Sequence, residues 1–121
     1  MALANVIPPR GALTSLYTTD SPISTGNANL SESMENFDFL ILRAVTNYEE
    51  VSMVVPMPMV KNTTIISTQG SEASDSGTST YPRYRASLQL TKSSVTQFTV
   101  DSRYNNSAWK LSLKEVIGVK L

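Results

Sequence analysis

Cysteine and histidine are both absent from the chain. Without cysteine there is no disulfide framework and no thiolate nucleophile, and without either residue there is no Cys/His zinc site. A Ser-His-Asp triad and histidine-based acid–base catalysis are excluded for the same reason. Carboxylate pairs, Ser/Lys arrangements and oxygen-only metal sites are the catalytic options left. We therefore expect a protein that is not an enzyme and that holds no cofactor and no metal.

An excess of charge of either sign is also missing. The 121 residues include 10 Lys+Arg and 10 Asp+Glu, so the formal net charge is zero. Binding to nucleic acid needs a surplus of positive charge, so no nucleic-acid partner is expected. The chain has no apolar run long enough to insert into a membrane. Its first ten residues lack the basic region and the apolar length of a signal peptide.

Short alternating segments dominate the first half of the chain. Residues 37–45 are apolar on both faces, which predicts a strand buried on both sides, against a second sheet or another subunit. Residues 51–59 alternate again, but Pro56 and Pro58 indicate an edge strand or a bent one. The methionines of this run form an apolar stripe that we expect in the core or in a subunit interface. Residues 63–68 form a short β-branched strand, and the small polar residues 69–80 form a long exposed loop.

The second half continues the same pattern. Residues 84–90 alternate between apolar and polar side chains, as expected for a strand with one face on the core and one in water. A turn at residues 92–94 leads to a strand around Phe98 and Val100, and a second turn covers residues 104–107. Residues 109–119 fit either a strand or a helix. The cleaner alternation and Gly118 favour the strand.

These elements predict one all-β domain. We expect an antiparallel β-sandwich or a jelly-roll-like domain over residues 13–121. Residues 1–12, which include Pro8, Pro9 and Gly11, read as a short extended N-terminal arm.

Three blocks of sequence carry a resemblance to known proteins. They are Leu16-Tyr17 followed by Asn29–Ile41 (NLSESMENFDFLI), then residues 84–90 and 95–100 (YRASLQL and VTQFTV), and finally residues 116–121 (VIGVKL). Their order and spacing resemble the small C-terminal β domains of bacteriophage tail fibres and tail spikes. In that family a hydroxyl-rich strand leads into an aromatic-Asp strand in the first block. One departure is Ile117, since an aromatic residue is common before the closing glycine in that family.

The resemblance implies a function and a setting. A tail fibre tip domain attaches the virion to a bacterial surface receptor, either a glycan or an outer-membrane protein. Such a domain is usually a homotrimer, and other virion tail proteins are its neighbours. The implied location is the virion tail, after synthesis in the host cytoplasm. Two alternatives remain open: a structural virion protein for head decoration or tail joining, and a monomeric carbohydrate-binding module.

Candidate receptor-binding residues lie in or beside the predicted loops. Aromatic rings stack on ligands while amides and guanidinium groups donate hydrogen bonds, which selects Tyr81, Arg83, Tyr104, Asn105 and Asn106. Other aromatic residues near loops, such as Tyr84 and Trp109, lie on apolar faces and are expected in the core.

The charged residues allow two interpretations. Arg83 and Arg85 share the outward face of one strand, with Arg43 expected near them. They would bind an anionic polysaccharide or a lipopolysaccharide phosphate, pair with carboxylates such as Asp38 or Asp101, or form an intersubunit contact. The acidic clusters Glu49-Glu50 and Glu72/Asp75 do not have the arrangement of a glycosidase carboxylate pair.

Overall fold

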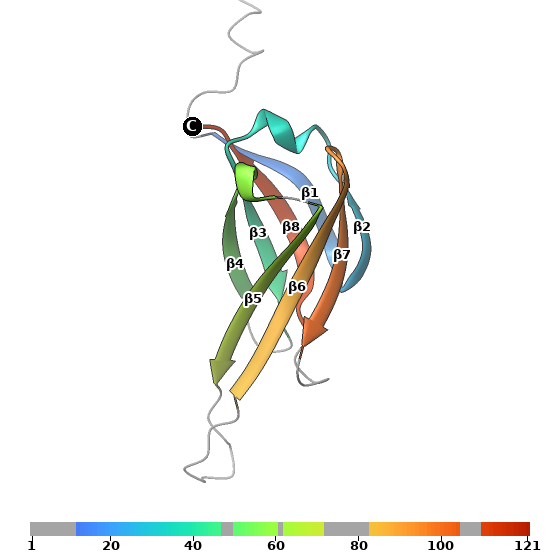
Figure 1. Ribbon diagram of the computed structural model, residues 1–121, viewed down its shortest axis with the longest axis vertical. Helices are drawn as coiled ribbons and strands as arrows, with labels where there is room; N and C mark the ends of the chain where they lie inside the picture. The colour runs from blue at the N-terminus through green and yellow to red at the C-terminus, as the bar shows by residue number, and fades with distance from the viewer. Residues whose placement is uncertain (1–11, 47–49, 61, 72–82, 105–109) are drawn as a thin grey trace, which may run out of the picture.

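A computed structural model describes residues 12–46, 50–60, 62–71, 83–104 and 110–121. Within these ranges two four-stranded antiparallel sheets face each other, in the strand orders β1-β8-β3-β4 and β2-β7-β6-β5 (Figure 1). This architecture confirms the predicted all-β sandwich. The strands are β1 (Leu13–Ile23), β2 (Thr25–Asn29), β3 (Phe39–Val45), β4 (Glu50–Pro56), β5 (Thr63–Ser71), β6 (Arg83–Ser94), β7 (Gln97–Tyr104) and β8 (Ser112–Val119). Of the expected N-terminal arm, residues 1–11 lie outside the described ranges.

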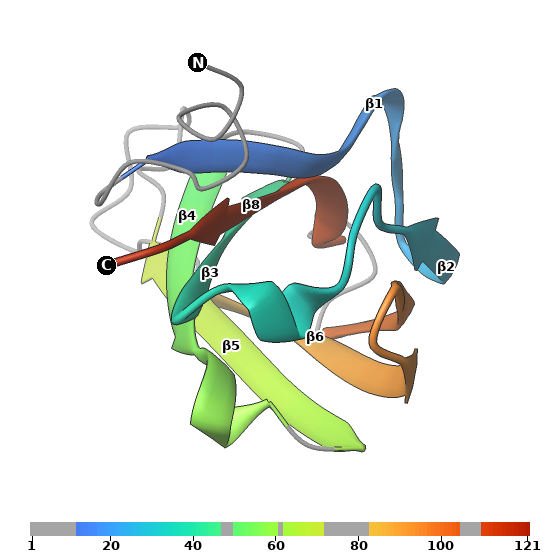
Figure 2. The same cartoon turned by 90° about the horizontal axis from the view of Figure 1, so that it is seen from above.

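The two sheets combine pairings between sequence neighbours with pairings between distant strands. β3 and β4 form a hairpin, and β5, β6 and β7 form a meander of sequence neighbours. β1 and β2 follow each other directly but lie in opposite sheets, where each pairs with a strand from the end of the chain. The view from above shows the chain passing from one sheet to the other between β1 and β2 (Figure 2). These two long-range pairings join the first strands to the last in both sheets.

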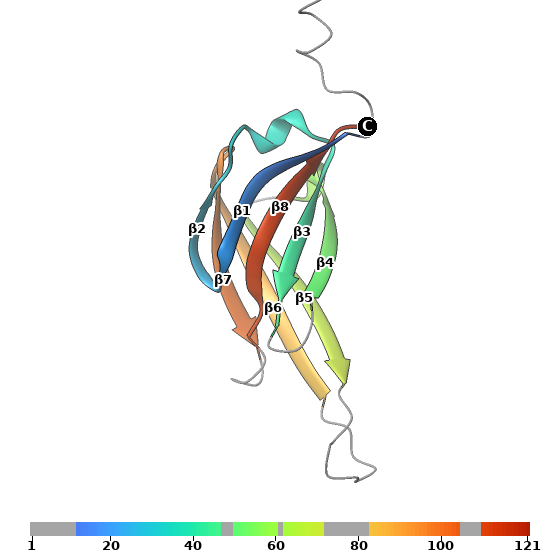
Figure 3. The ribbon, with the colours of Figure 1, turned by 180° about the vertical axis from the view of Figure 1, so that it is seen from behind.

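The sandwich has two distinct ends. At the first, which we call the terminal pole, β1 begins at Leu13 and β8 ends at Val119 (Figures 1 and 3). At the opposite end, which we call the loop pole, β3, β5 and β7 end and β4, β6 and β8 begin. Because all pairings are antiparallel, every second connection of the chain returns to the same pole.

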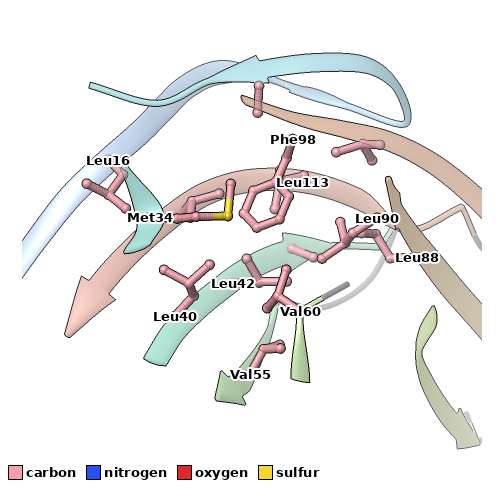
Figure 4. Close-up of a cluster of buried hydrophobic side chains, with 14 of the residues drawn as sticks. Leu16, Met34, Leu40, Leu42, Val55, Val60, Leu88, Leu90, Phe98 and Leu113 are labelled. Atoms are coloured by element: carbon pink, nitrogen blue, oxygen red, sulfur yellow. The ribbon is translucent and has the colours of Figure 1, made fainter. Parts of the chain in front are cut away.

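Strict alternation builds the core between the sheets. In β3 the side chains of Leu40, Leu42 and Ala44 are fully buried, while the residues between them are only half-buried. The other sheet contributes the facing side chains, among them Leu88, Leu90 and Phe98 (Figure 4). Full burial of each large apolar side chain stabilises the fold by about 1.5–3 kcal/mol. The core is therefore the main source of stability in a chain without disulfides.

Residues 30–38 close the terminal pole and join the sheets. The amides of Leu30 and Met34 donate to the carbonyls of Thr96 and Val95, at 2.8 Å each, in the β6–β7 turn. The amide of Ser31 donates to the carbonyl of Leu16 in β1, also at 2.8 Å. A 3₁₀ helix, η2 (Met34–Asn36), begins after Ser33, whose side chain accepts the amide of Glu35. The segment therefore spans the space between the two sheets (Figure 2).

Several predicted boundaries are wrong. The strand expected at residues 37–45 begins at Phe39, because residues 30–38 form the closing segment with η2 in place of the hydroxyl-rich strand. The run 51–59 stops at Pro56, where a second 3₁₀ helix, η3 (Met57–Met59), begins. Proline can open such a helix but cannot donate to a sheet. β4 is an edge strand, as predicted.

Other differences concern burial and turns. β3 is fully buried on one face only; its other face is half-buried, so the predicted burial on both sides is not present in the single chain. The apolar stripe of methionines divides, because Met53 and Met57 pack against the core whereas Met59 is 64 % exposed. β5 extends to Ser71, into the predicted loop. β6 extends to Ser94, so the turn falls at residues 95–96 instead of 92–94. Residues 13–29 form two strands that the alternation pattern did not reveal, and β8 confirms the strand over the helix.

Candidate functional site

Two of the predicted receptor-binding residues reach the same end of one sheet. Arg83 opens β6 and Tyr104 closes β7, and these neighbouring strands are antiparallel. Tyr104 pairs with Ala86, three residues beyond Arg83. The backbone positions of both residues therefore lie at the loop pole of the β2-β7-β6-β5 sheet. Tyr81, Asn105 and Asn106 lie outside the described residues, as do the side chains of Arg83 and Tyr104.

Arg43 is not near the other predicted arginines. It lies in β3 of the opposite sheet, whereas Arg83 and Arg85 lie in β6, so the expected cluster of three arginines is wrong. Register across the whole sheet, rather than sequence pattern, decides its partners. The Arg43 guanidinium donates from Nη1 to Glu115 Oε1 at 2.5 Å and from Nε to Glu50 Oε1 at 2.7 Å.

The carboxylates expected to pair with arginine 83 or 85 have other partners. Asp101 accepts from Arg103 Nε at 3.1 Å, within the same strand. Asp38 Oδ2 accepts the backbone amide of Leu121 at 2.7 Å and lies 3.8 Å from Lys120 Nζ. Asp38 therefore anchors the end of β8 to the start of β3.

Glu115 is the centre of a charged cluster on the outer face of the β1-β8-β3-β4 sheet. Its Oε2 accepts the hydroxyl of Ser15 at 2.7 Å, and its other oxygen accepts from Arg43. Both hydrogen bonds lower the pKa of Glu115, and the bond from Ser15 has the larger effect. The bonds from Arg43 to Glu115 and Glu50 raise the pKa of the guanidinium. Lys114 Nζ lies 3.9 Å from Glu50 Oε2. The Glu115 carboxylate is thus held in its ionised form, which suits a structural role and not proton transfer.

Apolar side chains occupy the rest of this outer face. One row of cross-strand partners consists of Leu13, Val119, Phe39 and Pro56, and the next row consists of Ser15, Ile117, Ile41 and Val54. The charged cluster begins in the third row, where Arg43 pairs with Glu115. We call the seven apolar residues of the first two rows the outer patch. Those of the first row come from all four strands and those of the second from β8, β3 and β4, at the end of the sheet where β1 begins and β8 ends.

The outer patch contains both exposed and half-buried members. Leu13 and Val54 are 64 % and 63 % exposed. Phe39, Ile41 and Ile117 are half-buried, whereas Val119 is buried between neighbours in its row. The sequence pattern shows that the outer side of β3 is apolar, but it does not show the two rows of cross-strand partners. Only the register aligns Phe39 and Ile41 with residues of β8 and β4.

The outer face of the other sheet is polar. Asn29 accepts from Gln97 Nε2 at 2.8 Å, and Asn27 accepts from the hydroxyl of Thr99 at 2.7 Å. The ion pair of Asp101 and Arg103 lies on the same face. We call this surface of β2, β7, β6 and β5 the amide–hydroxyl face. Its described outward side chains are Thr25, Asn27, Asn29, Thr63, Ile65, Ser67, Ser87, Gln89, Thr91, Gln97, Thr99, Asp101 and Arg103.

The described residues contain no cluster of three or more carboxylates that could hold a metal ion. Of the acidic pairs considered from sequence, Glu50 is bound to Arg43, whereas Glu49, Glu72 and Asp75 lie outside the described ranges. In the part of the chain that the structure describes, no helix is long and apolar enough to cross a membrane.

No family model fits the chain, and no curated protein is significantly similar to it in sequence. The poles and faces of the sandwich are therefore the features from which its function follows.

Proposed function

We propose that this chain is a receptor-binding tip domain of a bacteriophage tail fibre or tail spike. In this proposal it works in the virion tail as a homotrimer, catalyses no reaction, and attaches the virion to a bacterial surface glycan or outer-membrane protein. Two features support this function: the resemblance of three sequence blocks, and the difference between the two ends of the sandwich. The difference between the terminal pole and the loop pole is the observation that carries it.

In this proposal the terminal pole attaches the domain to the fibre, and the loop pole binds the receptor. β1 begins and β8 ends at the terminal pole, which residues 30–38 close with hydrogen bonds to both sheets. β6 begins with Arg83 and β7 ends with Tyr104 at the opposite pole. A fibre shaft preceding Leu13 would join the terminal pole, and the backbone positions of Arg83 and Tyr104 would then lie at the end distant from the virion. Loops on a rigid β scaffold are the usual carriers of recognition.

The resembling blocks also have a structural reason to occur together. Phe37 and Asp38 of the first block contact Gly118 and Leu121 of the third, so both blocks build the closed terminal pole. The second block supplies the β6–β7 hairpin, whose turn carbonyls accept the amides of residues 30 and 34. The three blocks thus support the scaffold, and recognition falls to the loop pole.

Binding to whole bacterial cells tests this proposal. The purified chain, labelled with a fluorophore on its amines, would be titrated onto a broad panel of Gram-negative and Gram-positive strains. We expect saturable binding to some strains and at least a 10-fold weaker affinity for the Arg83→Ala/Tyr104→Ala double variant. Lys120→Ala at the terminal pole is the matched control and should bind as the parent does. Absence of binding across the panel, or an unchanged double variant, would contradict the proposal.

A structural virion protein is the second candidate, and the outer patch favours it. An apolar surface of this kind suits contact with another protein more than contact with a hydrated cell surface. Such a protein would bind purified virions and ignore cells. The monomeric carbohydrate-binding module is less well supported, because the described residues of the amide–hydroxyl face include no aromatic ring on which a sugar would stack.

A further inference from the structure

The two outer faces of the sandwich differ in chemistry. An antiparallel sheet with one face on the core normally shows a polar face to water. The amide–hydroxyl face follows this rule, since Ile65 is the single apolar side chain among its described outward residues. The outer patch breaks it, with seven apolar residues in two adjacent rows. Contiguous exposed apolar surface on a soluble domain marks a contact with another molecule.

The charges beside the outer patch indicate what that molecule is. Arg43 and Lys114 lie with Glu50 and Glu115, so two positive and two negative groups are arranged side by side and paired. Burial of this cluster therefore leaves no uncompensated charge. A partner with an excess of one sign would gain nothing from it. A second copy of the same surface presents positive and negative side chains to the negative and positive side chains of the first. The whole chain has zero net charge, so copies do not repel one another.

We propose that the outer patch is the contact surface between copies of this chain. The outer faces of β1-β8-β3-β4 from three copies meet around a common three-fold axis, with Val54 and Leu13 as the exposed anchors and the Arg43–Glu115 cluster at the rim. The inference deepens the proposed function and rests on it only for the number of copies. Contact through this face leaves the loop pole and the amide–hydroxyl face open to a receptor.

Mass measurements on matched variants test the surface. Val54 and Ile65 are 63 % and 66 % exposed, both lie on edge strands, and they belong to opposite outer faces. Light scattering across a concentration series should give about three chains of 13.2 kDa for the parent. Val54→Lys should weaken assembly by roughly 100-fold or more, because it introduces a charge into an apolar contact. Ile65→Lys should assemble as the parent does.

A fluorescent reporter identifies the occupant of the patch. Because the chain has no cysteine, Val54→Cys and Ile65→Cys each carry a single polarity-sensitive label. The label at position 54 should shift to the blue as protein concentration rises, and the label at position 65 should not. Shielding at position 54 that is independent of concentration, and lost when residues 1–11 are removed, would assign the patch to the N-terminal segment and overturn the proposal.

The remaining outcomes are also decisive. A parent chain that stays monomeric up to about 100 μM, well above a micromolar dissociation constant, would overturn self-association. So would assembly that Ile65→Lys disrupts and Val54→Lys does not. Thermal unfolding of each variant establishes that it is folded. Cell binding is measured separately. A monomer that binds cells would refute the contact surface but not receptor recognition. An assembly that does not bind cells would refute receptor recognition but not the contact surface.

Discussion

The ring of Phe37 lies directly on the backbone of Gly118. A Cβ atom built on that glycine would be 2.6 Å from Phe37 Cγ, inside any normal contact distance. Phe37 is 5 % exposed, so its ring has little room to move away. The contact joins the segment that closes the terminal pole to the last strand of the chain.

Gly118→Ala should therefore destabilise the fold. We expect a loss of about 1–3 kcal/mol, the typical cost of overpacking a well-packed contact. Urea unfolding measures it, with a double-mutant cycle against Phe37→Ala as the control. In the Phe37→Ala background the added methyl group has space, so the cost of Gly118→Ala should largely disappear. An equal cost in both backgrounds would mean that the ring is not the cause.

Met34 anchors the closing segment in the core. Its side chain is fully buried, whereas Met59 in η3 is 64 % exposed. Met34→Ala should cost about 2–5 kcal/mol, as expected for a large cavity in a core. Met59→Ala serves as a matched control and should change the free energy of unfolding by less than about 0.5 kcal/mol. Equal effects of the two substitutions would show that residues 30–38 do not pack as described.

Asp38 holds the end of β8 through the amide of Leu121. Asp38→Ala should speed amide hydrogen exchange near residues 117–121 and lower global stability by roughly 0.5–1.5 kcal/mol, the net contribution of such a hydrogen bond. Exchange in β5 and β6 should stay as it is in the parent. Asp101→Ala, which removes an exposed ion pair with Arg103, is the control. Unchanged exchange at residues 117–121 would argue against the anchor.

Glu115 should make stability depend on pH in the acid range. Hydrogen bonds from Ser15 and Arg43 lower its pKa in the folded chain, so below the ordinary glutamate value the unfolded chain binds more protons than the folded one. The contribution is complete above a pH of about 4.5 and is lost as the pH falls through the lowered pKa. Urea midpoints measured between neutral and acid pH should fall less steeply for Glu115→Gln than for the parent. Ser15→Ala should give an intermediate slope, and identical slopes for all three proteins would refute the coupling.

Much of the architecture was predictable because strand alternation is local. The buried series Leu40, Leu42, Ala44 and the series of β6 are visible as every second residue, and they set which faces meet in the core. Residues 13–29 were harder to interpret, because β1 is an edge strand rich in hydroxyl residues in which Leu16 is the single fully buried side chain. Turn positions shifted by a few residues wherever a strand continued beyond its apolar part, as β6 does.

Part of the candidate site was likewise predictable from the sequence, and part was not. Residue type beside a predicted turn indicates Arg83 and Tyr104, and the strand order brings their backbone positions to one pole. The predicted partners of Arg43 were wrong because its carboxylates come from β4 and β8, and no sequence pattern connects Arg43 with Glu115.

The all-β class, the absence of cysteine and histidine chemistry and the balance of charge follow from composition and from neighbours along the chain, so they can be established without a structure. Strand pairing depends on contacts between distant residues and follows from the folded structure. Ser15 meets Glu115 across 100 residues of sequence, and Phe37 meets Gly118, because register is fixed by packing of whole strands. The rows of the outer patch exist only in that register, since the seven residues come from four different strands.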